Sequence, residues 1–299
     1  MAGPQVRRIR RRDINEEAWD AAVASDPTPL PYWLHWWLDA ATDRSWEGLV
    51  VDDYRAVLAL PRLRRLRVMP VYIRPPYTQQ LGPYGQWTDE DVTALLRAVP
   101  NLPQIALPLR PSLSAAHVPE GYTTRRRINY VLDLSPDFPT VVRGFSKRMR
   151  SYVRKHSADT LQLADRREVV QLCQERLGGR GGVRDYHFAR LDNLVRACME
   201  RHHGQLYQLL EDGELLCAGF YPEFNGRTFN AAAASTELGL QRRGMTRMLA
   251  QVMRQRSGVA GAAFDFEGSE LPGVKEYFAS FGGQDEGYLL AQRQWFGQP

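Results

Sequence analysis

The segment Phe264–Gly283 constrains the fold of this 299-residue chain more than any other. Its first residues, Phe264-Asp265-Phe266-Glu267, alternate apolar and acidic side chains, which predicts a strand whose two carboxylates share a face. A Gly-Ser turn follows, with Ser269 as the expected cap of a helix. Helical spacing then places four apolar side chains on one face of that helix: Val274, Tyr277, Phe278 and Phe281. A strand that turns directly into an amphipathic helix indicates a mixed α/β fold.

Length and composition set the class of protein. A chain of 299 residues with 43% hydrophobic and 24% charged residues fits a globular protein of two domains. No apolar run approaches the length that spans a bilayer, and the basic N-terminus has no apolar segment behind it, so neither a membrane span nor a secretory signal is expected. The three cysteines are scattered and form no disulfide framework. We therefore expect a cytoplasmic protein.

Arginine is concentrated in patches. Five arginines lie within Arg7–Arg12, and residues 54–88 contain no Asp or Glu. Such patches favour a phosphate-rich partner, which could be tRNA, a nucleotide-linked substrate or coenzyme A; no DNA partner is expected. The alternative is an arginine-biased composition, with Arg7–Arg12 as a solvated chain end.

The order of predicted elements occurs twice along the chain. In the second half, a strand at 130–134 and helices at 139–157, 169–176 and 188–203 precede a three-strand meander with turns at Asp212-Gly213 and Asn225-Gly226. A methionine-rich helix, the strand 262–267, a helix at 273–281 and a last strand near 287–294 follow. The first half shows a blurred version of the same order, without a repeat at residue level. We therefore predict an α/β (α+β) fold of two tandem domains, residues 1–125 and 126–299, each a mixed, mostly antiparallel sheet flanked by helices.

Several segments make the chain resemble the bacterial tandem-GNAT proteins related to the FemABX transferases. They are Trp33–Asp39, Asp53–Pro61, Pro75–Gly82, Gly144–Lys147 and Phe264–Phe281. The resemblance implies a degenerate GNAT-like first domain on the acceptor side and a GNAT-like second domain on the donor side. It also implies transfer of an aminoacyl group from aminoacyl-tRNA to an amine of a peptidoglycan precursor, a natural product or a peptide. Two alternatives stay open: an N-acyltransferase that uses acyl-CoA or an acyl carrier protein, and a non-catalytic binding protein on the same fold.

The expected donor site follows from this resemblance. Gln241-Arg242-Arg243-Gly244-Met245-Thr246 resembles the Q/R-x-x-G-x-G/A phosphate loop of GNAT enzymes, although Thr246 replaces the small last residue. Free amides at a helix N-terminus bind phosphate oxygens, and the two arginines would strengthen the site. The small residues Ala233, Ala234 and Ser235 of the preceding strand would let a donor lie against the backbone; the alternative is tight packing of that strand against a helix. No tightly bound cofactor is expected, only the donor co-substrate, aminoacyl-tRNA or acyl-CoA.

The remaining candidates are catalytic or acceptor-binding residues. Glu267 is the candidate base or amine-binding group, with Asp265, Ser269 and the candidate acid Tyr277 beside it; a core role for Tyr277 is the alternative. A basic helix carries four candidate phosphate ligands, Lys147, Arg148, Arg150 and Arg154. The polar segment after Pro75 carries four candidate acceptor ligands, Tyr77, Gln79, Gln80 and Tyr84. No metal site is expected, because the adjacent histidines His202 and His203 point apart on a helix.

Overall fold

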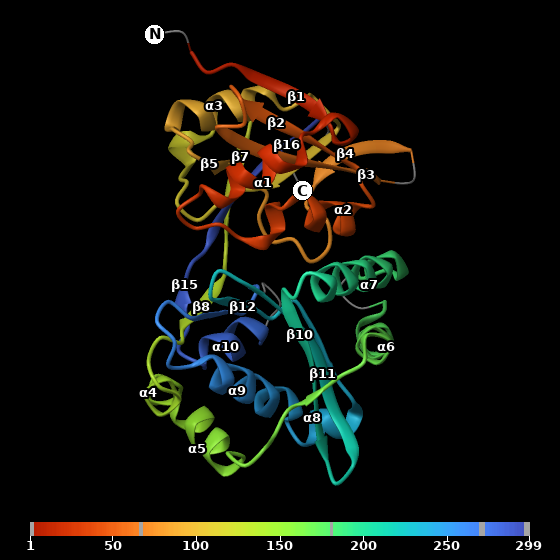
Figure 1. Cartoon of the computed structure of the whole chain (residues 1–299), viewed down its shortest axis with the longest axis vertical. Coiled ribbons are helices and arrows are strands. Elements are labelled where there is room, and N and C mark those ends of the chain that lie inside the picture. The colour runs from red at the N-terminus through yellow and green to blue at the C-terminus, as the bar shows by residue number, and fades with distance from the viewer. Residues whose placement is uncertain (1–2, 66–67, 180–181, 269–272, 296–299) are drawn as a thin grey trace. The chain divides into compact units, whose positions relative to one another are not determined.

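The computed structural model describes residues 3–65, 68–179, 182–268 and 273–295, and the chain forms two compact units. Unit 1 is Met1–Arg127 together with Gly287–Pro299, and unit 2 is Ile128–Glu286. In Figure 1 the chain leaves unit 1 after the yellow segment and returns to it as the blue strand β16.

Unit 1 is built on a sheet with the strand order β1-β2-β3-β4-β6-β16-β7, and β5 pairs with β3. Its strands are β1 (Val6–Arg10), β2 (Trp46–Val51), β3 (Ala56–Arg65), β4 (Met69–Ile73), β5 (Tyr84–Gly85), β6 (Gln104–Pro108), β7 (Thr123–Arg127) and β16 (Tyr288–Gln294). Its α-helices are α1 (Glu16–Ala24), α2 (His35–Thr42) and α3 (Asp89–Ala98). Leu95 and Leu96 of α3 pack with Leu49 and Leu58 on one face of the sheet. On the other face Gly48 leaves room for the ring of Trp19 from α1.

Unit 2 has the strand order β15-β8-β14-β12-β11-β10-β9, and β13 pairs with β11. Its strands are β8 (Tyr130–Asp133), β9 (Gln162–Leu163), β10 (Gly204–Glu211), β11 (Glu214–Phe224), β12 (Arg227–Phe229), β13 (Ala232–Ser235), β14 (Ala263–Asp265) and β15 (Gln284–Asp285). Its helices are α4 (Phe138–Arg143), α5 (Lys147–Lys155), α6 (Arg166–Leu177), α7 (Asp185–Glu200), α8 (Glu237–Gln241), α9 (Gly244–Arg256) and α10 (Val274–Ala279). The core gathers Met248, Leu249 and Val252 of α9 with Phe264, Phe266 and Phe281.

The structure corrects three predictions about the elements. The last strand, expected to complete the second domain, pairs instead with β6 and β7 of unit 1. The helix expected at 139–157 is two helices, because Ser146 accepts the Met149 amide as the cap of a new helix after Gly144. The strand expected at 228–234 is β12 and β13, which both pair with β11 but not continuously.

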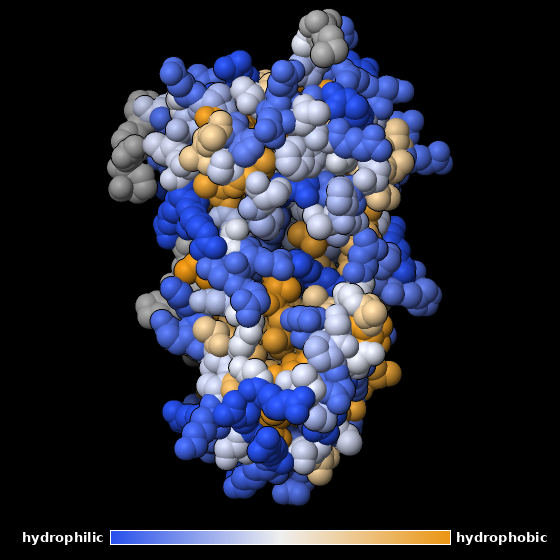
Figure 2. Space-filling model, turned by 90° about the vertical axis from the view of Figure 1, so that its left-hand side faces the viewer, coloured by the Kyte–Doolittle hydropathy of each residue, from blue (hydrophilic) through white to orange (hydrophobic). Residues whose placement is uncertain are grey.

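The described strands are mostly antiparallel, as predicted. Within the described ranges only β4 with β6 and β12 with β14 run parallel. In the same ranges no helix combines the length and the apolar character that crossing a membrane requires. Hydrophilic side chains cover most of the face shown in Figure 2, and apolar side chains gather there in smaller areas.

Candidate functional site

Two neighbouring segments of the sheet of unit 2 separate partway along their length. Arg227–Phe229 pair in parallel with Ala263–Asp265, and the Asn230 amide donates to the Asp265 carbonyl oxygen at 2.9 Å. Beyond this point the two segments separate, because the Phe266 amide donates to Tyr130 and β13 pairs with β11. Among the described strands none pairs with the other edge of β13. That edge of β13 therefore carries backbone groups that no described strand pairs with, and α6 packs against the same strand.

Helix α8 and the start of α9 lie close to the sheet because each has a glycine there, Gly239 and Gly244. A Cβ on Gly239 would collide with the Leu216 carbonyl oxygen, and one on Gly244 would lie 2.8 Å from the Leu216 Cβ. Thr236 caps α8 by accepting the Gly239 amide at 3.0 Å. Arg243, the N-cap of α9, has a left-handed backbone and its side chain makes no capping hydrogen bond. No side chain of the N-cap thus occupies the amides in the first turn of α9.

A cavity of about 510 Å³ opens next to this helix start. Its lining residues come from α5, from β13 and the α8–α9 turn, and from α10, all of them in unit 2 (Figure 1). They are Ser146, Arg148, Met149, Tyr152, Ser235, Gly239, Leu240, Arg243, Met245, Thr246, Gly273, Glu276, Tyr277 and Ser280. Three of these side chains carry charge: two arginines and Glu276. The lining therefore combines apolar side chains with two arginines and one carboxylate.

Two tyrosines, Tyr152 and Tyr277, form hydrogen bonds with other residues in or next to the cavity wall. The hydroxyls of Tyr277 and Thr246 are 3.0 Å apart and share a hydrogen bond. Burial raises the pKa of Tyr277, so its hydroxyl stays protonated at neutral pH. The Tyr152 hydroxyl donates to the Arg242 carbonyl at 2.7 Å, and the Arg243 guanidinium lies 5.2 Å from the centre of the Tyr152 ring. Arg243 is thus held over the cavity by a cation–π contact rather than by a carboxylate.

The four basic candidates of the predicted helix have different surroundings. Arg148 lines the cavity. Arg150 donates to the carbonyl oxygens of Arg143 and Phe145, at 2.8 and 3.0 Å, and so caps the C-terminus of α4. Among the described residues no acidic side chain pairs with Lys147, Arg148 or Arg154. These three therefore leave an uncompensated positive surface on α5.

The carboxylates after β14 do not share a face, so that prediction is wrong. Asp265 is fully buried, pairs with Arg227 at 3.1 Å and accepts the Asn129 amide group at 3.2 Å. It also accepts the Glu267 backbone amide at 2.8 Å, which folds the chain into a turn and gives Glu267 a φ of 63°. Burial raises the pKa of Asp265, against the opposing effect of Arg227. Neither carboxylate lines the cavity, and Ser269 lies outside the described residues.

The predicted donor residues are distributed around the cavity. Ser235 and Arg243 line it, and Gly244 begins α9 beside it. Ala234 is buried and Ala233 half-buried, on alternate faces of β13. Gln241 and Arg242 lie outside the lining, and Arg242 pairs with Glu211 at 3.5 Å. The predicted loop thus contributes Arg243 and the helix start to the cavity, and not its first two residues.

The predicted acceptor residues lie in unit 1, and three of them are buried. Gln79, Gln80 and Tyr84 are each exposed by only 1%. Gln80 donates to the Gln79 side-chain oxygen at 2.9 Å, and Tyr84 stacks on Trp33. Tyr77 is half-buried with a φ of 56°. The structure places Gln79, Gln80 and Tyr84 in the interior of unit 1, where Tyr84 packs on Trp33 and each of the three keeps one buried side-chain polar atom without a hydrogen-bond partner.

Sequence reasoning missed Ser146, Leu240, Glu276 and Ser280 as cavity residues. Ser146 and Glu276 both act at helix starts, where Ser146 accepts the Met149 amide and Glu276 accepts the Gly273 amide at 2.8 Å. A signal for Ser146 existed, because a serine before a basic amphipathic segment indicates a helix N-cap. This signal predicts two helices in place of the one expected at 139–157, with the second beginning at Ser146.

Comparisons with known proteins identify the fold. No family model matches the chain, and no curated protein matches it. Among solved structures, FemX superposes with a TM-score of 0.68 and 13% identity over 95% of this chain and 96% of that one. L-PGS from Bacillus licheniformis gives 0.55 and 13% over 95% and 94%, and a GNAT-family acetyltransferase from Colwellia psychrerythraea gives 0.55 and 11% over 96% and 98%. The predicted FemX-like and GNAT-like α/β fold is thereby confirmed.

Proposed function

We propose that this chain is an acyltransferase that moves an aminoacyl group from aminoacyl-tRNA to the amine of a second substrate. The observation that carries the proposal is the cavity at the start of α9, where Arg148, Arg243 and an uncapped helix N-terminus surround a space next to the open edge of β13. Anions bind such helix starts through backbone amides and the helix dipole. Unit 2 would hold the donor there.

The chemistry needs few groups. The neutral amine of the acceptor attacks the ester carbonyl carbon of the donor, and the carbonyl oxygen becomes an oxyanion that amides on the edge of β13 can stabilise. When the tetrahedral intermediate collapses, the new C–N bond remains and the C–O bond to the ribose breaks. The leaving oxygen takes a proton from Tyr277, and the amine proton returns to Tyr277 or to water. The position of the Tyr277 hydroxyl in the cavity lining, 3.0 Å from the Thr246 hydroxyl at the start of α9, supports this role.

The surface of α5 favours a large polyanionic donor. Lys147, Arg148 and Arg154 carry no acidic partner among the described residues, and Arg148 joins that surface to the cavity. A polynucleotide can neutralise several such charges at once by releasing its counterions. We therefore rank aminoacyl-tRNA ahead of a small donor.

A second candidate is transfer from an acyl thioester of coenzyme A or of a carrier protein. The apolar side of the cavity, formed by Met149, Leu240 and Met245, favours it, because an acyl chain would bury its surface there. A non-catalytic binding role would keep the cavity and need no proton donor. The Glu267→Gln variant tests whether this carboxylate takes part in the reaction. A direct role requires that the variant lose turnover, whereas a non-catalytic protein would show no effect.

A binding competition tests the proposal. Purified protein is titrated with aminoacyl-tRNA, uncharged tRNA, acetyl-CoA and a longer acyl-CoA at two salt concentrations. Tight, salt-sensitive binding of charged tRNA that Arg243→Gln weakens supports the first candidate. Saturable binding of acyl-CoA alone would replace it with the second. Binding of none of these ligands would contradict the tRNA and coenzyme A donors and would favour a carrier-protein donor or the non-catalytic role.

A further inference from the structure

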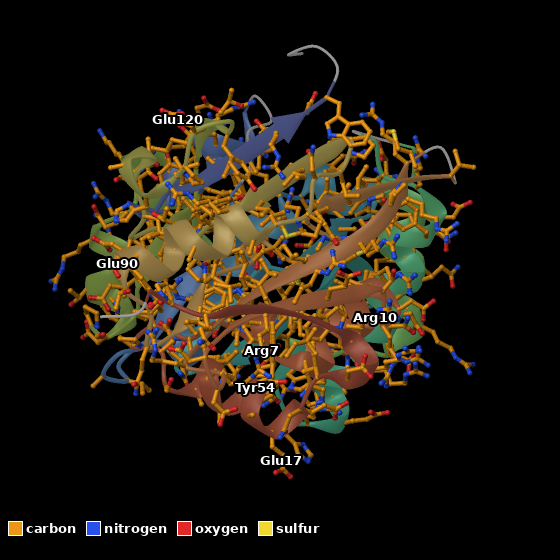
Figure 3. All side chains as sticks on the ribbon, turned by 90° about the horizontal axis from the view of Figure 1, so that it is seen from above. Arg7, Arg10, Glu17, Tyr54, Glu90 and Glu120 are labelled. Atoms are coloured by element: carbon orange, nitrogen blue, oxygen red, sulfur yellow. The ribbon has the colours of Figure 1, made fainter. Side chains whose placement is uncertain are left out.

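A second cavity, of about 630 Å³, lies wholly in unit 1 and is lined mainly by arginines. The run Arg7–Arg12 contributes to it as an ordered element, because residues 6–10 form the edge strand β1 and pair with β2. Figure 3, which looks down on this unit, shows Arg7 and Arg10 on that strand. The alternative prediction of a floppy chain end is therefore wrong for these residues, although the side chains of Arg7, Arg8 and Arg10 are exposed to solvent.

The cavity lies where one face of the sheet is no longer covered by α3. Residues directly opposite each other in an antiparallel pair share a face, so Arg10 lies beside Glu47, and Arg8 beside Leu49. Arg62 and Tyr72 face each other on β3 and β4. Leu49 packs under α3. Past the helix, which is followed by Pro100 and Leu102, the same face continues with charged side chains.

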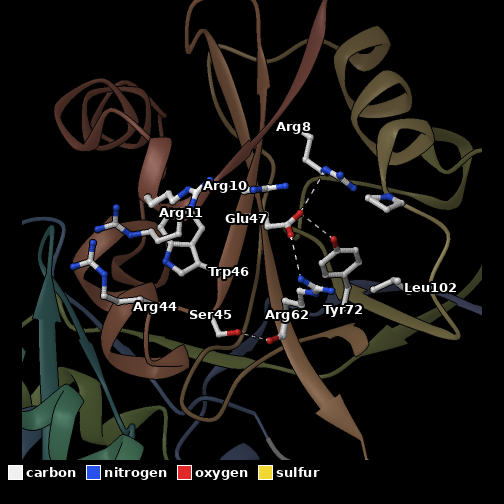
Figure 4. Close-up of a pocket in the computed structure, with 12 residues that line it drawn as sticks. Arg8, Arg10, Arg11, Arg44, Ser45, Trp46, Glu47, Arg62, Tyr72 and Leu102 are labelled. Carbon is white, nitrogen blue, oxygen red and sulfur yellow. Dashed lines mark hydrogen bonds and ion pairs between the residues drawn. The ribbon is translucent and has the colours of Figure 1, made fainter. Parts of the chain in front are cut away.

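One carboxylate stands at the centre of this cavity. Glu47 lies 3.6 Å from Arg8 and 4.0 Å from Arg62, and it accepts a hydrogen bond from the Tyr72 hydroxyl at 3.1 Å (Figure 4). Burial, and secondarily Glu47, raises the pKa of Tyr72 to about 12, so its hydroxyl remains a neutral donor. Two guanidinium groups and a phenol thus already converge on an oxyanion.

The positive charge of the cavity exceeds what Glu47 can balance. Arg10 has no acidic partner among the described residues, and the side chains of Arg8 and Arg62 are each 53% exposed. At the rim, Arg44 reaches Asp39 only at 3.7 Å. Arg11 differs, because it is buried and bonded to Asp39 at 2.6 Å, which makes it part of the scaffold. Arg8, Arg10 and Arg62 therefore carry three positive charges, and Glu47 supplies the one carboxylate among the described lining residues.

We propose that this cavity binds a phosphate-bearing ligand, with Arg8, Arg10 and Arg62 as its ligands and Tyr72 as a neutral donor. Guanidinium groups bind phosphate oxygens through paired hydrogen bonds, and half-exposed ones do so without first losing a buried partner. Glu47 holds the arginines in place and competes with the ligand. The site lies in unit 1 and goes beyond the transfer activity proposed for unit 2.

The proposal is tested by calorimetric titration with inorganic pyrophosphate and, separately, with a short RNA. The Arg243→Gln variant is titrated alongside, so that phosphate bound at the cavity of unit 2 is counted apart. We expect Arg10→Gln and Arg62→Gln each to weaken binding about tenfold, the loss of one charge-assisted hydrogen bond. Arg97→Gln is the matched control, since Arg97 is exposed on α3 and does not line the cavity. Thermal unfolding establishes that each variant is folded.

Glu47→Gln separates a built site from general positive charge. Removing the competing carboxylate should tighten pyrophosphate binding about threefold or more, the opposite direction from the arginine variants. Binding of RNA but not pyrophosphate, with the same pattern of variants, would support the site and assign its phosphate to a nucleic acid backbone. The proposal is overturned if wild type binds neither probe, if Arg97→Gln weakens binding as much as Arg10→Gln, or if Glu47→Gln leaves affinity unchanged.

Discussion

Units 1 and 2 contain the same local arrangement, a helix between two parallel strands, but the two helices begin differently. In unit 1 α3 connects β4 to its parallel neighbour β6, and in unit 2 α9 lies between β12 and its parallel neighbour β14. At the start of α3, Thr88 and Asp91 form a capping box, and Arg55 holds Asp91 by two hydrogen bonds of 2.6 and 2.9 Å. At the start of α9, Arg243 makes no cap.

The third residue of each helix shows what this difference means. In α3 that residue is Asp91, whose carboxylate accepts the Thr88 backbone amide at 2.7 Å. In α9 it is Thr246, whose hydroxyl turns to Tyr277 instead. The chain's own carboxylate thus fills the anion site of unit 1, whereas the same place in unit 2 opens into a cavity. The arrangement is closed by a side chain in the first unit and borders a cavity in the second.

The largest expected effect comes from removing the Asp91 carboxylate at the start of α3 in unit 1. Asp91→Ala should lower the free energy of unfolding by about 3 kcal/mol, because it removes two charge-assisted hydrogen bonds from Arg55 and the acceptor of the Thr88 backbone amide, while Thr88 still caps the helix. Glu90→Gln, one residue earlier and exposed (Figure 3), should change it by less than about 0.5 kcal/mol. Chemical denaturation measures both. A small loss for Asp91→Ala would show that the closed helix start contributes little.

The same carboxylate predicts a pH dependence. Burial alone would raise the pKa of Asp91, but hydrogen bonds from Arg55 and Thr88 outweigh it and lower the pKa below its ordinary value of 3.8. A lowered folded pKa means stability that is present above pH 3.8 and is lost as the pH falls through the folded value. Asp91→Ala should therefore lose less stability between pH 4 and pH 2 than wild type does. Parallel curves would contradict the assignment.

The second effect concerns the open helix start of unit 2. Tyr277→Phe should lower kcat about 100-fold with little change in donor affinity, because it removes the proton donor and leaves the ring in place. Tyr186→Phe is the control, since Tyr186 is exposed on α7. Steady-state and single-turnover kinetics with the donor identified by the binding competition give both values. If Tyr277→Phe weakens donor binding about 100-fold and leaves kcat unchanged, Tyr277 contributes to binding and not to proton transfer.

Local signals in the sequence predicted much of this framework. The turns at Asp212-Gly213 and Asn225-Gly226 join β10 to β11 and β11 to β12 as predicted, because both turns need residues that tolerate positive φ. The methionine-rich periodicity predicted α9, and its apolar face is buried. These features depend on neighbours within a few residues.

Features that depend on distant partners could not be predicted. The pattern of residues 287–294 indicates a strand, but nothing in it shows that Leu290 will pair with Pro108 and Arg125. The alternation of Asp265 and Glu267 indicates a shared face, but Asp265 is buried against the half-buried Arg227, and its carboxylate accepts the Glu267 amide and turns the backbone there. The cavity of unit 2 collects side chains from helix ends far apart in sequence, of which only some carried a motif.

A third prediction converts the open helix start into the closed one. Thr246→Asp places a carboxylate at the position that Asp91 occupies in α3, where it can accept first-turn amides. Donor binding should weaken about 30-fold, or about 2 kcal/mol, through repulsion of the donor's anionic group. Stability should stay the same or rise slightly. Thr246→Asn, which has the same shape and no charge, is the control, and equal affinity for the two variants would show that the helix start does not meet an anion.

The smallest effect separates two adjacent arginines. Arg243 lines the cavity of unit 2 and stacks on Tyr152, whereas Arg242 is 61% exposed and pairs with Glu211. Arg243→Gln should weaken donor binding about fivefold to tenfold and reduce its salt dependence, because one guanidinium no longer meets the donor. Arg242→Gln should change affinity less than twofold. Binding is measured for both variants at several salt concentrations. If they behave alike, general positive charge accounts for the attraction, and the start of α9 does not position the donor. If only Arg243→Gln weakens binding, the donor binds at the start of α9, which lacks the side-chain cap that α3 has.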